Sequence, residues 1–178
     1  MVRRVSVQAG HQQNVAEELV SWFAGVWRAP AYESFCRAAA PRFAADVRMV
    51  QPLVRTHTGV DAFCRNIAPL FAAMPDVHGR VLDWRGDERT VFIEFHLQGT
   101  LGGRFVRLHV TDRFTLRHGA VAERVSFFDP TPLLWAALRS PRALIALATM
   151  RRRGRRLYET AFPSGFTTSQ VPPNSTTS

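Results

Sequence analysis

The chain has 178 residues, of which 46% are hydrophobic and 21% charged, and all 23 of its basic residues are arginines. The formal net charge is +9, but five arginines lie within residues 151–156, and without them the charge falls to +4. The remaining arginines are not interleaved with the aromatic residues and glycines that stack on bases, which argues against nucleic-acid binding. The length suits one domain of about 130 to 150 residues followed by a tail.

Neither a targeting signal nor a metal site is expected from the sequence. The first ten residues are too polar for a secretion signal, and no apolar run approaches the length of a membrane span. Cys36 and Cys64 lack CxxC spacing, and the six histidines lack HxH or HxxxH spacing. We therefore expect a cytoplasmic protein with two buried free thiols, no metal and no other cofactor.

Helical periodicity dominates the start of the sequence. Apolar residues at intervals of three and four predict a helix over residues 14–27, and Trp22 and Phe23 belong to its inward face. Pro30 opens a second short helix, because proline is favoured in a first helical turn. The inward stripe of this second helix is expected to run as far as Phe43.

A strand and a third helix follow. Residues 46–51 alternate as a strand does and stop before a proline. Residues 56–59, which include His57, are expected to form a loop. Residues 60–71 return to helical spacing, with Phe63 on the inward face.

The second half of the sequence alternates as strands and carries turn signals between them. The expected strands cover residues 77–83, 90–98, 104–116 and 120–128. Helices followed by a meander predict an α+β fold, in which a curved antiparallel sheet wraps as a conical barrel around the N-terminal helices. This cone domain is expected over residues 11–130, and it would enclose a cavity.

Asp112 interrupts the apolar face of the strand at residues 104–116, between Val110 and Phe114. A carboxylate that points into a core must find partners or rise in pKa, which is a frequent condition of catalytic acids. Arg124 and Ser126 share a face of the next strand, and if that face turns inward, Arg124 meets Asp112. That ion pair would lower the pKa of Asp112. The pattern leaves open whether Asp112 is catalytic or a structural partner of Arg124.

Glu94 and His96 alternate with the apolar residues of the strand at residues 90–98, so one of the two sets faces the cavity. A solvent or dimer face tolerates charge better than a cavity does. We therefore place Glu94 and His96 on the outer face and Phe95 on the inner one. The opposite register would give an acid–base pair inside the cavity.

Several features together resemble the nuclear transport factor 2-like superfamily, and within it the SnoaL-like polyketide cyclases. They are the order of the helices, a strand ending in Val50-Gln51-Pro52, Gly59 before the third helix, and a closing strand that ends in Phe127-Phe128-Asp129. The resemblance covers residues 15–129. It implies a conical barrel, commonly a homodimer through the outer sheet face, with an apolar pocket that serves isomerases, cyclases, epoxide hydrolases and non-enzymatic binders. It predicts a cavity but not its chemistry.

The resemblance also assigns single positions. Asp112 corresponds to the protonated aspartic acid of ketosteroid isomerases, whereas the general base of those enzymes corresponds to Gln51. The arginine and the two aspartates of the epoxide hydrolases correspond to Phe95, Leu97 and Ser126. Asp112 therefore remains a candidate acid, but the partners that these relatives require are replaced.

We predict a small cofactor-independent enzyme that acts on an apolar or polycyclic, oxygenated metabolite by acid–base chemistry of the cyclase, isomerase or dehydratase type. Asp112 and Arg124 are the expected catalytic residues. The residues expected to contact the substrate are Gln51, Ser126, Trp22, Phe23, Phe63, Phe95, Phe114, Phe128 and His57. The alternative is a non-catalytic ligand-binding or dimerising module of the same fold.

The C-terminal part changes character. Residues 131–158 contain two short apolar helices, at 133–138 and 143–150, and then the arginine run. These helices are expected either to cover the sheet or the cavity mouth, or to rest on an anionic membrane through residues 141–156. On a membrane each arginine could add about 1 kcal/mol. Residues 159–178 are rich in Ser, Thr and Pro and are expected to be a disordered tail.

Overall fold

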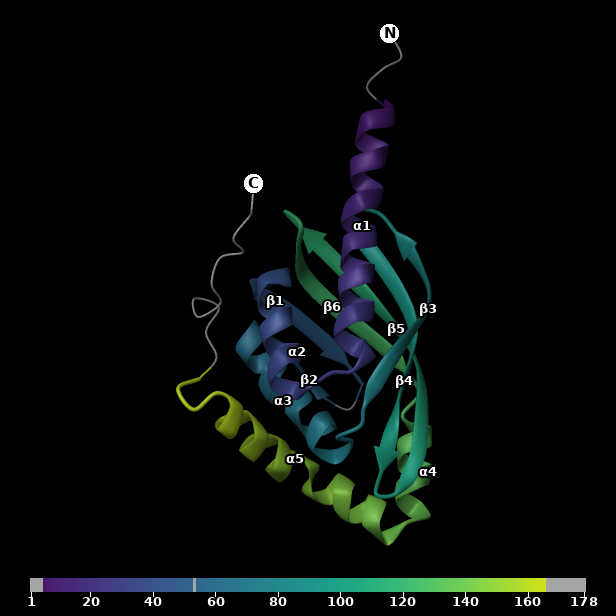
Figure 1. The fold of residues 1–178 in the computed structure, drawn as a ribbon, viewed down its shortest axis with the longest axis vertical. Helices are drawn as coiled ribbons and strands as arrows, with labels where there is room; N and C mark the ends of the chain where they lie inside the picture. The colour runs from purple at the N-terminus through teal and green to yellow at the C-terminus, as the bar shows by residue number, and fades with distance from the viewer. Residues whose placement is uncertain (1–4, 53, 166–178) are drawn as a thin grey trace.

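A computed structural model describes residues 5–52 and 54–165, and it has the α+β architecture predicted from the sequence (Figure 1). The helices are α1 (Val5–Arg28), α2 (Tyr32–Ala39), the 3-10 turn η1 (Ala40–Arg42), α3 (Val60–Ala73), α4 (Thr131–Leu138) and α5 (Pro141–Ala161). The strands are β1 (Phe43–Gln51), β2 (Val54–Thr58), β3 (His78–Gly86), β4 (Thr90–Leu101), β5 (Arg104–Arg117) and β6 (Ala120–Phe128).

The six strands form one curved sheet in the order β2-β1-β6-β5-β4-β3. Successive hairpins make β3 to β6 antiparallel, but β1 runs parallel to β6. Because β2 and β3 remain at opposite edges, the described sheet does not close. The curved sheet and its helices are thus confirmed, whereas the expectation of a purely antiparallel barrel is corrected to a mixed, open sheet.

The core lies between the sheet and the N-terminal helices. α1 crosses one face of the sheet (Figure 1), and its Phe23 packs edge-to-face on Phe95 of β4 with ring centroids 4.9 Å apart. Trp27, one turn further along α1, packs on Phe35 of α2 at 4.6 Å. Edge-to-face aromatic pairs add stabilisation beyond the area that they bury. This cluster fixes α1 and α2 over one half of the sheet.

Two local expectations in the first half of the chain were wrong. Phe43 begins β1 and does not continue the α2 stripe, because Pro41 lies in the η1 turn that ends the helix. Residues 54–58 form the edge strand β2 and not a loop, and Met49 of β1 pairs with His57. The polar, threonine-rich sequence of β2 lacks the apolar alternation that marks a half-buried strand.

The C-terminal helices also differ from expectation. α5 continues through the arginine run to Ala161, so residues 159–161 are helical and the expected tail cannot begin at 159. Phe162 is also buried, packed on Tyr32 and Tyr158, and residues 166–178 of the expected tail lie outside the described residues. Within the described part of the chain, no helix is both long and apolar enough to cross a bilayer.

Candidate functional site

A cavity of about 920 Å³ lies between the sheet, α3 and α5. Its sheet wall comes mainly from β4, β5 and β6, and includes Phe95, Leu108, Val110 and Phe128. α3 contributes Ile67, Pro69 and Leu70, and α5 contributes Met150, Arg151, Arg155, Tyr158 and Glu159. A cavity of this size, with apolar walls and a set of polar groups that includes five arginines, is typical of a small-molecule site.

Asp112 and Arg124 form a buried ion pair beside this cavity. Asp112 is completely buried, and its Oδ2 accepts a hydrogen bond from Arg124 Nε at 2.7 Å and lies 2.6 Å from Arg124 Nη2 in the ion pair. Neither contact uses Arg124 Nη1, and Arg124 lines the cavity whereas Asp112 does not. The Asp112 carboxylate thus orients the Arg124 guanidinium but does not itself line the cavity. Arg124 is the member of the pair that can contact a ligand.

Burial decides the protonation equilibrium of Asp112. Complete burial raises the pKa of this carboxyl above its ordinary value, and the Arg124 charge opposes the rise without cancelling it. The expectation that the ion pair would lower the pKa of Asp112 is therefore corrected. Protonation of Asp112 therefore costs less free energy than protonation of an exposed aspartate, although Arg124 carries a permanent positive charge.

The sheet register places Ser126 next to this pair. Asp112 lies directly opposite Ser126 in the β5–β6 ladder, and Phe114 lies opposite Arg124. Among the described residues, neither Ser126 Oγ nor Asp112 Oδ1 has a hydrogen-bond partner, although the hydroxyl is close enough to favour the ionised carboxylate. Ser126 lines the cavity. Its hydroxyl is therefore available to a ligand oxygen or to water.

The sequence-predicted residues divide into two groups. Gln51, Phe95, Arg124, Ser126 and Phe128 line the cavity. The other aromatic candidates do not, because they are packed against α1, α2 and β1 in the core or beside it. These residues are Trp22, Phe23, Phe63 and Phe114.

His57 is on β2, on the same sheet face as Arg124, because Met49 of β1 pairs with both residues. It is not among the residues that line the cavity. Its Nδ1 is 3.3 Å from the carbonyl oxygen of Arg55, and its buried Nε2 has no hydrogen-bond partner among the described residues. Burial lowers the pKa of His57, and the Arg124 charge acts in the same direction. His57 is therefore neutral at neutral pH.

Glu94 and His96 point to the outer face of the sheet, as predicted. Glu94 Oε1 is 2.6 Å from Nε2 of His109, its neighbour on that face, while Ile93 and Phe95 are buried. No group of three His, Cys, Asp or Glu side chains in residues 5–52 and 54–165 is arranged to hold a metal ion. Cys36 and Cys64 are buried free thiols.

The sequence profile of the SnoaL-like domain matches residues 20–124, which is more than half of the chain. The chain belongs to the SnoaL-like domain family. Asp112 and Arg124 both lie inside the matched segment, but the end of β6 and all of α4 and α5 lie beyond it. This SnoaL-like chain therefore completes its cavity with a helix that the family match does not include.

Solved structures agree with this assignment at the level of the fold. A protein described as a SnoaL-like polyketide cyclase from Jannaschia sp. CCS1 superposes with a TM-score of 0.62 at 19% identity, over 70% of this chain and 92% of that one. A protein with a ketosteroid isomerase-like fold from Catenulispora acidiphila gives 0.59 at 20% identity, over 67% and 91%. An LEH-like epoxide hydrolase from M. tuberculosis gives 0.57 at 13% identity, over 77% and 98%.

The sequence matches none of the curated proteins with which it was compared. At these low identities the similar structures indicate the nuclear transport factor 2-like fold, and members of that fold differ in chemistry. The chemistry of this SnoaL-like chain must therefore be argued from its own cavity.

The sequence left open whether the C-terminal helices cover the cavity mouth, and the structure places α5 in the cavity wall, but the sequence prediction named none of its lining residues. α5 approaches α3 closely at Gly154, where a Cβ atom would lie only 2.4 Å from the backbone nitrogen of Pro69. Gly154 is buried although arginines surround it in the sequence. A single glycine inside a helical arginine run was the available signal, because glycine in a helix interior is unfavourable unless close packing requires it.

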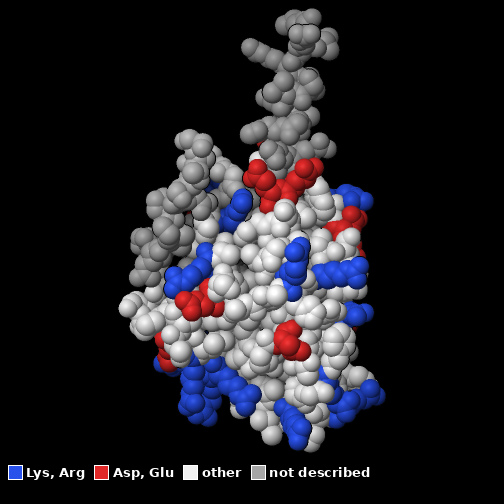
Figure 2. Space-filling model, in the orientation of Figure 1, with Lys and Arg blue, Asp and Glu red and all other residues white. Residues whose placement is uncertain are grey.

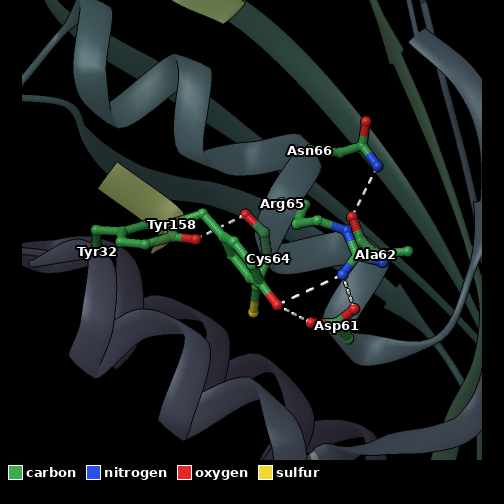
Figure 3. A network of polar contacts seen from close by, with 7 residues as sticks. All are labelled: Tyr32, Asp61, Ala62, Cys64, Arg65, Asn66 and Tyr158. Carbon is green, nitrogen blue, oxygen red and sulfur yellow. Dashed lines mark hydrogen bonds and ion pairs between the residues drawn. The ribbon is translucent and has the colours of Figure 1, made fainter. Parts of the chain in front are cut away.

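Polar contacts fix α5 in this position (Figure 3). The Tyr158 hydroxyl donates to Asp61 Oδ1 on α3 and accepts from Arg65 Nη1 at 3.4 Å. Asp61 also pairs with Arg65. Nearby, the Tyr32 hydroxyl of α2 donates to the backbone carbonyl of Cys64 at 3.0 Å. α5 is thus held to α3 by backbone packing at Gly154 and by hydrogen bonds at Tyr158.

Proposed function

We propose that the chain is a cofactor-independent enzyme of the SnoaL-like family that acts on an apolar, oxygenated metabolite by acid–base chemistry. The observation that carries this proposal is that Arg124 is buried in the wall of the cavity, whereas the four other arginines that line it are exposed. A fixed cationic donor in such surroundings stabilises negative charge on a substrate oxygen more strongly than it would in water. Enolisation, aldol-type cyclisation and dehydration all develop such a charge.

Asp112 acts in this proposal through Arg124 and not on the substrate. Its Oδ2 receives both Nε and Nη2, which fixes the plane of the guanidinium and leaves the other N–H groups for the ligand. Ser126 and Gln51, which also line the cavity, supply a hydroxyl and an amide to orient the substrate. Asp112 is therefore a positioning residue.

Few of the described residues at the cavity could act as the base of the proposed reaction. Among the described cavity-lining residues, Glu159 is the only carboxylate, and its Oε1 accepts a hydrogen bond from Arg155 Nε at 2.8 Å. His57 is neutral and shares a sheet face with Arg124, but it lies behind the cavity wall. This scarcity of bases favours the second candidate function, a non-catalytic binding module that uses the same cavity.

Arg124→Met separates the two functions when 2-tetralone, a bicyclic ketone, is the probe. The wild-type chain is expected to accelerate exchange of the α-hydrogens of 2-tetralone in deuterated buffer, as followed by NMR. Loss of one charge-stabilising donor should slow the catalysed exchange by about 10²-fold. Arg113→Met is the matched control, because Arg113 pairs with Glu123 on the outer face and should leave the rate unchanged.

The outcomes distinguish the candidates as follows. Saturable binding of 2-tetralone without exchange above the buffer rate would reject the enzyme and favour the binding module. Equal rates for wild type and Arg124→Met would reject Arg124 as the donor. Circular dichroism of each variant shows whether it is folded, so that a lost rate is not mistaken for a lost structure.

The mouth of the cavity favours a ligand that also carries an anionic group. The exposed lining residues include Arg55 of β2 and Arg151 of α5, and no ion pair or hydrogen bond of either guanidinium occurs within the described residues. Anilinonaphthalene sulfonate, which combines an apolar body with an anion, is therefore expected to bind. Exposed ion pairs contribute up to about 1 kcal/mol each, so Arg55→Met/Arg151→Met should weaken binding about 3- to 10-fold. Fluorescence titration measures this, and an unchanged affinity would contradict it.

A further inference from the structure

The edge formed by α4 and the start of α5 exposes a group of large apolar side chains. We call it the hairpin patch, and it consists of Leu134, Trp135, Leu138, Leu144 and Ile145, which are 51–70% exposed. Single exposed apolar residues are common, but five on two adjacent helices form a contiguous surface that usually has a partner. No residue of the hairpin patch lines the cavity.

The charge around the hairpin patch has a single sign. Residues 131–158 contain seven arginines and no acidic residue. In Figure 2 the blue side chains gather along the lower edge of the molecule, over α4 and α5, where little red is visible. On α5 the spacing places Ile145, Ala148 and Arg152 on one helix face, so the apolar surface continues into the arginine run.

The hairpin patch is held rigidly on the body of the protein. Ser140 Oγ caps α5 by accepting from Ala143 N at 3.3 Å and donates to the carbonyl of Gly102 in the β4–β5 turn, also at 3.3 Å. Arg104 Nη2 donates to the carbonyl of Arg139 at 2.9 Å. The Arg139 guanidinium in turn lies 4.4 Å from the centroid of the Trp135 ring. An aromatic side chain stacked with an arginine is suited to the boundary between acyl chains and headgroups.

We propose that the hairpin patch docks the protein on the surface of an anionic lipid bilayer. The apolar side chains would enter the interfacial layer, and the arginines would contact anionic headgroups, each adding about 1 kcal/mol. A second copy of the chain is a poor alternative occupant. A two-fold contact would place the same seven arginines of each copy close to those of the other without any acidic residue between them. An anionic membrane provides both the apolar layer and the negative charge.

The full chain can be tested by sedimentation with phosphatidylcholine vesicles that contain or lack phosphatidylglycerol. We expect at least about ten-fold stronger binding to the anionic vesicles, because residues 131–158 carry seven arginines and no acidic residue, and a steep fall in binding as salt is raised. Leu138→Glu/Ile145→Glu should lose at least about ten-fold of this affinity through lost apolar burial and added negative charge. Phe92→Glu is the matched control, because Phe92 is 43% exposed on the outer sheet face, at the far end of β4.

Three results would overturn the proposal. One is equal binding to the two kinds of vesicle, and another is undiminished binding of Leu138→Glu/Ile145→Glu. The third is a wild-type dimer in size-exclusion chromatography that Leu138→Glu/Ile145→Glu dissociates, since the hairpin patch would then be a contact between copies. Exchange of the α-hydrogens of 2-tetralone should be unchanged in Leu138→Glu/Ile145→Glu, because no residue of the hairpin patch lines the cavity, so this experiment fails or succeeds independently of the cavity.

Discussion

Replacing Asp112 with leucine is expected to lower the free energy of unfolding by about 3 to 5 kcal/mol, the usual loss when one member of a buried ion pair is removed. Arg124 remains only 8% exposed in the folded chain and would keep its charge without a partner. Arginine does not lose its proton in proteins, so the cost cannot be avoided by a shift in its pKa. Urea unfolding followed by circular dichroism measures the loss.

Two further variants test whether the lost stability comes from breaking the Asp112–Arg124 ion pair. Asp112→Leu/Arg124→Met removes both charges and should recover most of the lost stability, because an apolar pair of similar volume can replace a buried ion pair. Arg124→Met alone should be milder, since Asp112 can take up a proton. Its pKa is already raised in the folded state, so the stability of Arg124→Met should be highest at acidic pH and fall as the pH rises through that pKa. A loss in Asp112→Leu no larger than an ordinary surface substitution would contradict the ion-pair account.

The second large effect is expected at Gly154. In Gly154→Ala the new Cβ would lie 2.4 Å from Pro69 N and 2.6 Å from Pro69 Cδ, so α5 must move away from α3. Overpacking of this kind costs about 1 to 3 kcal/mol, although alanine is otherwise favoured in a helix. The displaced wall should also weaken binding of anilinonaphthalene sulfonate. Thermal unfolding and fluorescence titration on the same samples measure the two effects together.

Gly25→Ala is the matched control for this variant. Gly25 is an exposed glycine in α1, and no atom beyond its local backbone lies within 4 Å of the position of an added Cβ. Alanine there should stabilise the chain by about 0.5 to 1 kcal/mol through helix propensity alone. If Gly154→Ala also stabilised the chain and left the cavity unchanged, the close contact between α5 and α3 would be refuted.

The parts of the fold predicted from the sequence are those with strong local periodicity. The alternation around Asp112 gave the correct face for every residue from Val106 to Leu116, and the inward position of Asp112 follows from that pattern. β2 was missed because an edge strand with polar residues has no such alternation. The parallel pairing of β1 with β6 joins residues far apart in the sequence, and local patterns carry no information about it.

At the candidate site, too, local periodicity predicts only part of the arrangement. Alternation places Phe95 and Phe114 on the inner face of the sheet, but only Phe95 reaches the cavity. Phe114 lies on the Arg124 row and packs against Phe23, because α1 covers that part of the sheet. Periodicity indicates the face of a strand but not how far along it a helix covers the sheet. Hydrophobic spacing left α5 as one possible cover of the cavity mouth, but it carries no information about the contacts of Gly154 and Tyr158 with α3 that place the helix there.

The wall formed by α5 has a consequence for how this kind of protein changes over evolutionary time. Most of the sheet and its ion pair lie in the segment that matches the family, whereas Met150, Arg151 and Tyr158 lie beyond it. Substitutions at these α5 positions would reshape one side of the cavity without changing the residues of the sheet. Ligand preference can thereby diverge through α5 while the ion pair of Asp112 and Arg124 stays the same.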